Sequence, residues 1–148
     1  MSLFAKIEKD FLAAYKAKES EKVAVLRMLK AAIKNFQIDA GRDMQDEDVL
    51  ALILKQAKQR KESITQFALA GRNDLKEQEE RELRILETYL PSPLSPEEIE
   101  AAVMQAVSET GANSPADMGK VMQVILSRFQ GQVDGKTVSA LVRQRLAR

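Results

Sequence analysis

The stretch from Tyr89 to Pro96 constrains this chain more than any other, because it holds three of the four prolines in a sequence otherwise rich in helix-forming residues. Proline lacks the amide hydrogen, clashes with the preceding helical turn and biases the residue before it toward extended backbone. A helix that arrives at Leu90 is therefore predicted to end there.

The same stretch predicts the start of a new helix. Ser95 is a favoured N-cap, Pro96 suits the first helical position, and Glu98 is spaced to complete a capping box with Ser95. Leu94 and Ile99 occupy the positions of a hydrophobic staple, in which apolar side chains before and inside the first turn pack together. A helix stop followed at once by a helix start is typical of a joint between domains.

Apolar spacing of three and four residues and capping signals predict helices throughout, without the alternation typical of strands. The expected helices run from 2 to 18, 20 to 40, 43 or 46 to 70, 73 to 89, 96 to 109, 115 to 129, and 134 to 146. The predicted fold class is therefore all-α. A bundle of about four helices (residues 1–92) is joined by the proline-rich hinge to a small three-helix domain (residues 93–148).

Charged residues interrupt or flank two of these predicted helices. Arg60 falls on the apolar line of the third helix, where we expect its stem to pack and its guanidinium to reach the surface, in preference to a ligand-binding role. In the fourth helix, Glu77 with Arg81 and Glu80 with Arg84 are four residues apart, a spacing that predicts ion pairs on a solvent-facing side. The cap of the third helix is expected from an aspartate at position 43 or 46.

Five of the six glycines fall at boundaries of predicted helices, and Gly119 alone lies further inside one, where it costs about 1 kcal/mol relative to alanine. Two explanations remain open. The favoured one is the close approach of a neighbouring helix, and the other is a backbone left open for a phosphate near the helix N-terminus, beside Lys120.

The composition removes several kinds of chemistry. There is no cysteine and no histidine, which excludes disulfides, thiolate zinc sites, thiol catalysis and the commonest general base. No glycine-rich phosphate loop or serine nucleophile elbow is present either. We therefore expect no catalytic residue, no metal and no cofactor. No apolar run approaches the roughly 20 residues of a membrane span, and the first residues turn charged too early for a signal peptide. These features predict a cytoplasmic protein without a membrane partner.

The net charge of the chain is only +1, but it is unevenly distributed. From Lys120 to the C-terminus there are six basic residues and one acidic residue, Asp134. This asymmetry has two explanations: an electrostatic face that binds phosphates, or the ordinary preference of basic side chains for helix C-termini. The charge distribution by itself favours the second explanation.

Seven short fragments carry a resemblance that covers nearly the whole chain. They are Lys16-Ala17-Lys18, Leu26-Arg27-Met28-Leu29-Lys30, Gln59-Arg60-Lys61-Glu62-Ser63-Ile64, Ala70-Gly71-Arg72, Tyr89-Leu90-Pro91, Asp117-Met118-Gly119-Lys120-Val121-Met122 and Asp134-Gly135-Lys136. In this order and spacing they resemble the GatB/YqeY family, in particular a stand-alone YqeY-like protein. The resemblance implies a helical N-terminal domain and a three-helix domain similar to the tail of the B subunit of tRNA-dependent amidotransferase. That tail is thought to contact tRNA.

The resemblance also implies a link to carbon–nitrogen ligase activity with glutamine as amide donor. This chain shows neither an ATP site nor a glutaminase nucleophile, so any such activity requires a partner, such as an amidotransferase or another protein of tRNA metabolism. The leading hypothesis is a non-catalytic tRNA-binding or tRNA-metabolism accessory protein. The alternatives are a component of an enzyme that transamidates misacylated tRNA, and a helical protein-interaction scaffold.

Basic residues supply the candidate RNA contacts of the leading hypothesis. The first set comprises Lys120, Arg128, Lys136, Arg143 and Arg145 in the C-terminal domain. The second set comprises Arg27, Lys30, Lys34, Arg60 and Lys61 in the N-terminal domain.

Overall fold

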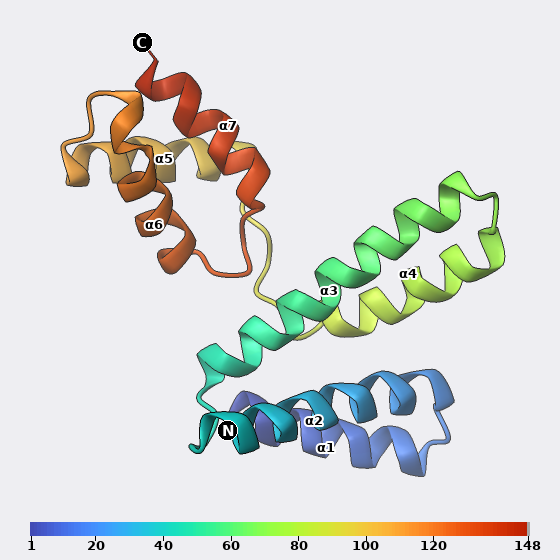
Figure 1. The fold of residues 1–148 in the computed structure, drawn as a ribbon. Helices are drawn as coiled ribbons and strands as arrows, with labels where there is room; N and C mark the ends of the chain where they lie inside the picture. The colour runs from blue at the N-terminus through green and yellow to red at the C-terminus, as the bar shows by residue number, and fades with distance from the viewer. Residues whose placement is uncertain (148) are drawn as a thin grey trace. The chain divides into compact units, whose positions relative to one another are not determined.

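The computed structural model describes residues 1–147, and every regular element in that range is helical (Figure 1). The predicted all-α class is confirmed. The elements are α1 (Leu3–Lys16), α2 (Ser20–Ala40), α3 (Asp46–Leu69), α4 (Asn73–Glu87), α5 (Pro96–Thr110), a 3₁₀ turn η1 (Pro115–Asp117), α6 (Met118–Arg128) and α7 (Gly135–Leu146).

The helices form two compact units, an N-terminal unit that ends at Leu90 and a C-terminal unit that begins at Pro91. The sequence placed the joint two residues later, between positions 92 and 93. The contact of Ser92 accounts for part of the difference, because its carbonyl accepts from the side-chain amide of Gln132 (3.1 Å), while the amide of Leu94 donates to the carbonyl of Gln132 (2.9 Å). Residues 92–94 are thus held by the C-terminal unit. Independent folding of the two units stays a prediction.

Two helical hairpins, α1–α2 and α3–α4, build the N-terminal unit (Figure 1). α3 packs along α4 and also contacts α1 and α2. Apolar residues three and four positions apart on α2 are buried: Leu26, Leu29 and Ile33 are fully enclosed together with Ile53 of α3 and Leu86 of α4. Burial of this shared apolar face is what holds the four helices together.

Side chains from distant helices replace several local contacts that the sequence predicted in this unit. Asp46 does not cap α3; its carboxylate accepts from the amide of Leu3 (2.9 Å), one of the free amides at the start of α1. Gln45 is the N-cap residue of α3. Arg81 pairs with Glu21 of α2 (3.0 Å) instead of Glu77. The fourth helix does form an ion pair at four-residue spacing, between Lys76 and Glu80 (3.6 Å), so Glu80 is paired within α4 but not with Arg84.

Tyr89 ties the end of α4 back to α1. Its hydroxyl donates to the carboxylate of Asp10 (2.6 Å), and the ammonium of Lys6 lies 5.5 Å from its ring centroid. Burial, with the hydrogen bond and the negative charge of Asp10 adding to it, raises the pKa of Tyr89. The last residues before the prolines are therefore anchored in the N-terminal unit.

Helices α5, α6 and α7 surround an apolar core in the C-terminal unit (Figure 1). The predicted capping box is confirmed: the Ser95 hydroxyl accepts from the Glu98 amide, and the Glu98 carboxylate accepts from the Ser95 amide, both at 3.1 Å. Leu94 packs against the core cluster that contains Ile99, so both residues of the predicted staple belong to one apolar group. Asp134 caps α7 by accepting from the amide of Lys136 (3.3 Å).

Candidate functional site

The basic residues of the C-terminal unit do not form one set. Lys120 lies in the first turn of α6, and Lys136 and Arg143 lie in α7; all three are exposed. Seven residues separate Lys136 from Arg143, which places them on one side of α7 about 10 Å apart along its axis. Arg145 falls on another side, where it lines a shallow depression between α5 and α7 with Met104. Arg145 therefore faces away from Lys136 and Arg143.

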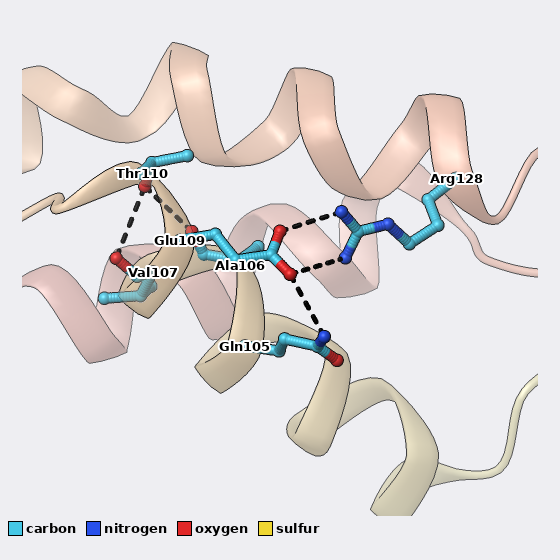
Figure 2. A network of polar contacts seen from close by, with 6 residues as sticks. All are labelled: Gln105, Ala106, Val107, Glu109, Thr110 and Arg128. Carbon is cyan, nitrogen blue, oxygen red and sulfur yellow. Dashed lines mark hydrogen bonds and ion pairs between the residues drawn. The ribbon is translucent and has the colours of Figure 1, made fainter.

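Arg128 is committed to a contact inside the unit. Its guanidinium donates two hydrogen bonds to the carboxylate of Glu109 (2.7 and 3.4 Å), and the side-chain amide of Gln105 donates to the same carboxylate (3.0 Å; Figure 2). The hydrogen bond from Arg128 lowers the pKa of Glu109. Arg128 thus joins α6 to α5, and Glu109 balances its charge.

The start of α6 differs from the predicted form. Asp117 accepts from the amide of Asn113 (3.1 Å) and from the hydroxyl of Ser114 (3.4 Å), and a 3₁₀ turn precedes the α-helix. The hydrogen bond from the Asn113 amide is the main reason that the pKa of Asp117 is lowered, and the positive charge of Lys120 contributes. Lys120 is therefore near one acidic group.

Gly119 has no neighbour that would require a glycine. A Cβ atom built at this position meets nothing within 4 Å, so the favoured explanation, close approach of another helix, is wrong. The backbone of the first turn of α6 is bare at the surface. The other explanation, a backbone open to a phosphate beside Lys120, stays a prediction.

Arg60 is buried, contrary to the expected surface position of its guanidinium. It is 8% exposed, and its Nε lies 3.5 Å from a carboxylate oxygen of Glu82 on α4. Within residues 1–147 this Nε has no hydrogen-bond partner, and the same holds for the side-chain oxygen of Gln56, one turn earlier. Arg60 does not reach the surface because α4 covers this side of α3. It is therefore unavailable to a ligand outside the unit.

Glu79 belongs to the same polar interface between α3 and α4. Burial raises its pKa, the negative charge of Glu82 adds to the increase, and the positive charge of Arg60 partly offsets it. The sequence offered a signal for this interface that was missed: Arg60 lies on the apolar line of α3, where the facing helix must supply a carboxylate.

The remaining members of the second basic set stay at the surface. Arg27 and Lys30 of α2 lie over the ring of Phe11 of α1, with the guanidinium carbon 5.8 Å and the ammonium 4.4 Å from the ring centroid. Lys34 follows one turn later on α2 and Lys61 lies on α3; both are exposed. The contact of Arg27 and Lys30 with Phe11 was not predicted from the sequence, because it joins side chains of two different helices.

Membrane spans and metal clusters are both absent from residues 1–147. No helix there is long and apolar enough to cross a membrane, and no group of three or more acidic side chains is placed to hold a metal ion.

Comparison with known proteins identifies the family. The family model described as "Yqey-like protein" matches residues 4–146. The chain belongs to the YqeY-like family. The predicted recognition as a stand-alone YqeY-like protein is confirmed, while the likeness to the tail of the amidotransferase B subunit stays a prediction.

Curated relatives of this YqeY-like chain are named "Altered inheritance of mitochondria protein 41, mitochondrial". The protein from Kluyveromyces lactis is 33% identical over 138 residues, which is 90% of this chain and 70% of the relative. The protein from Lachancea thermotolerans is 36% identical over 76% of this chain and 62% of the relative. The protein from Vanderwaltozyma polyspora is 37% identical over 70% and 57%. In the last two, the match spans less than two thirds of the relative.

These names contradict the expected cytoplasmic location, because the relatives are named as mitochondrial proteins. The expectation was wrong for a physical reason. A search for membrane spans and secretory signals tests only for transfer into or across a membrane by an apolar segment, and it carries no information about the organelle in which a helical protein works.

Proposed function

We propose that this YqeY-like protein is a non-catalytic accessory of tRNA metabolism that binds tRNA. The observation that carries the proposal is the exposed positive charge of Lys120, Lys136 and Arg143 in the C-terminal unit. Within residues 1–147, none of these three forms an ion pair with an acidic residue. Asp117 partly offsets the charge of Lys120, and exposed cations without an ion pair are able to neutralise phosphates.

The arrangement favours contact with the RNA backbone. Lys136 and Arg143 share one side of α7 about 10 Å apart, so each can meet a different phosphate. Gly119 leaves backbone without a side chain beside Lys120 in the first turn of α6, where the positive end of the helix dipole favours anions. Phosphate contacts carry little sequence information, so we expect modest affinity for structured RNA and a steep dependence on salt.

The experiment measures binding of the intact chain to tRNA over a series of salt concentrations. The test variant replaces Lys120, Lys136 and Arg143 with glutamine, and a charge-matched control replaces the exposed Lys9, Lys55 and Lys58 of the N-terminal unit with glutamine.

We expect the test variant to bind tRNA more weakly than the parent. The logarithm of its binding constant should also fall less steeply with the logarithm of the salt concentration, by roughly three units of slope, one for each phosphate that is no longer neutralised. The control should keep the parental slope, and neither variant should change the melting temperature much. Parent protein that fails to bind tRNA at low salt, or a test variant with the parental slope, would overturn the proposal and move the protein-interaction scaffold ahead.

The enzyme alternative has its own test. We expect the purified chain alone to show neither glutaminase nor ATP-dependent amidation activity. Turnover that a point substitution in this chain abolishes, and that further purification does not remove, would contradict the accessory role.

A further inference from the structure

The N-terminal unit carries an aromatic pair on α1, in which Phe11 packs partly against the core and Tyr15 is exposed. Phe11 and Tyr15 are one turn apart, with ring centroids 6.4 Å from each other and planes inclined by 30°. Tyr15 is 62% exposed, and Leu12, its neighbour one turn earlier, is 56% exposed. A single exposed tyrosine needs no explanation, so the neighbours of this one carry the argument.

Two cations lie against this pair. Arg27 and Lys30 of α2 both lie over the ring of Phe11, at 5.8 and 4.4 Å from its centroid. Lys34, one turn beyond Lys30, falls on the same side of α2. An aromatic ring attracts a cation without cancelling its charge, as a carboxylate would. Within residues 1–147, none of the three cations forms an ion pair.

This combination fits one class of ligand. Single-stranded nucleic acids are bound by aromatic rings on which bases stack, with cations beside them that hold the backbone. An apolar protein segment would use Tyr15 and Leu12 but would leave the positive charges of Arg27, Lys30 and Lys34 without partners. A polyanion with aromatic bases can contact both the exposed aromatic ring and the cations.

We propose that Phe11, Tyr15, Arg27 and Lys30 form a stacking platform for an unpaired stretch of RNA. Tyr15 takes a base on its open ring face, and Arg27, Lys30 and Lys34 hold the adjacent phosphates. The inference rests on the proposed function, to which it adds a second contact region that recognises unpaired bases. Glu8 lies one turn before Leu12 on α1 and opposes the binding of phosphates there.

The composition of the chain allows a direct test, because Tyr15 and Tyr89 are its two tyrosines. The intact protein is labelled with ¹³C-tyrosine, and the two sets of ring signals are assigned with Tyr89→Phe. The probes are a single-stranded oligoadenylate of about 12 nucleotides, within the usual site sizes, and inorganic polyphosphate of the same charge. We expect the oligoadenylate to shift the ring protons of Tyr15 upfield and to leave Tyr89 unchanged. Polyphosphate should not produce this shift, because it has no bases.

Variants test the energetic role of the ring. Tyr15→Leu keeps an apolar side chain but removes the stacking surface, so we expect its affinity for oligoadenylate to fall about fivefold to 150-fold. Tyr15→Phe keeps the ring and should keep the affinity. Glu8→Gln should bind more tightly, because it removes a negative charge from the platform.

The outcomes separate this inference from the proposed function. If Tyr15→Leu binds oligoadenylate as the parent does, or if polyphosphate shifts the Tyr15 signals equally, the platform is wrong. If tRNA still binds in a salt-dependent manner that requires Lys120, Lys136 and Arg143, the proposed function stands without the platform. If the parent chain binds neither tRNA nor oligoadenylate, both proposals are wrong.

Discussion

Each unit of the protein contains an arginine–glutamate pair that joins two helices, and the two pairs differ in burial. Arg60 and Glu82 join α3 to α4, with side chains 9% and 18% exposed and a closest contact of 3.5 Å. Arg128 and Glu109 join α6 to α5, with both side chains 42% exposed and a closest contact of 2.7 Å. The exposed pair has the shorter contact, but water already solvates its charges. Breaking it therefore costs less free energy than leaving a buried charge without its partner.

The residues around the two ion pairs also differ in burial and polarity. Around Arg60, the Gln56 side-chain oxygen has no partner within residues 1–147, and Glu79 carries a raised pKa. Among the described residues of the C-terminal unit, every buried residue is apolar, whereas the N-terminal unit buries Arg60. The N-terminal unit therefore buries polar groups that are incompletely paired, in addition to its exposed Arg81–Glu21 pair, whereas the ion pair of the C-terminal unit is exposed.

The largest effect should come from Arg60→Ala. Removal of the guanidinium leaves the carboxylate of Glu82 largely buried without its cation, so we expect a loss of about 3–5 kcal/mol in the free energy of unfolding. Urea unfolding followed by circular dichroism measures it. The control is the double variant Arg60→Met with Glu82→Leu, which removes both charges and should recover most of the loss. A loss below about 1 kcal/mol for Arg60→Ala would remove the basis of the comparison.

The sequence predicted some contacts between residues close along the chain, but the Glu77–Arg81 and Glu80–Arg84 pairs did not form, and no contact across helices was predicted. The capping box of Ser95 and Glu98 depends on a spacing of three residues, so the sequence alone specified it. Asp46 had the same local chemistry but bonds the amide of Leu3, 43 residues away. The partner of the Asp46 carboxylate depends on how α1 packs against α3, and a local sequence pattern contains no information about that packing.

The candidate site shows the same limit. Residue type and helical spacing sufficed to nominate Lys120, Lys136 and Arg143, which are exposed. They did not show that Arg128 would meet Glu109, or that α4 would cover Arg60, because both facts depend on the facing helix. Charge counts predict how much positive charge a segment carries, but packing decides how much of it remains available.

A second buried polar contact in the N-terminal unit should give the next largest effect. Tyr89→Phe removes the hydroxyl that donates to Asp10, and a hydrogen bond to a charged group is worth about 1.5–3 kcal/mol. We expect the melting temperature to fall in proportion to this loss of free energy. The matched control is Tyr15→Phe at the exposed tyrosine, which should melt as the parent does. Equal losses from the two substitutions would show that burial does not distinguish them.

Glu79 and Glu109 should change the stability of the folded protein with pH in opposite directions. The raised pKa of Glu79 means that the folded state binds its proton more tightly than the unfolded state, so stability falls as the pH rises from about 4.5 through the raised pKa. The lowered pKa of Glu109 gives stability that is present above its usual value and is lost as the pH falls through the folded pKa. We expect Glu79→Gln to raise the melting temperature at pH 7 and Glu109→Gln to lower it, with both differences smaller in acid. Changes of the same sign at pH 7 would contradict these assignments.

The smallest effect should come from Arg128→Gln, although it breaks the shortest ion pair in the described part of the chain. Both charged groups of the parent pair already face water, so the carboxylate left behind is solvated at once. We expect a melting temperature within about 2 °C of the parent. The small difference should shrink further at high salt, because ions screen exposed charges, whereas the loss from Arg60→Ala should remain. A loss as large as that of Arg60→Ala, and equally resistant to salt, would mean that hydrogen-bond geometry rather than burial sets the strength of these pairs.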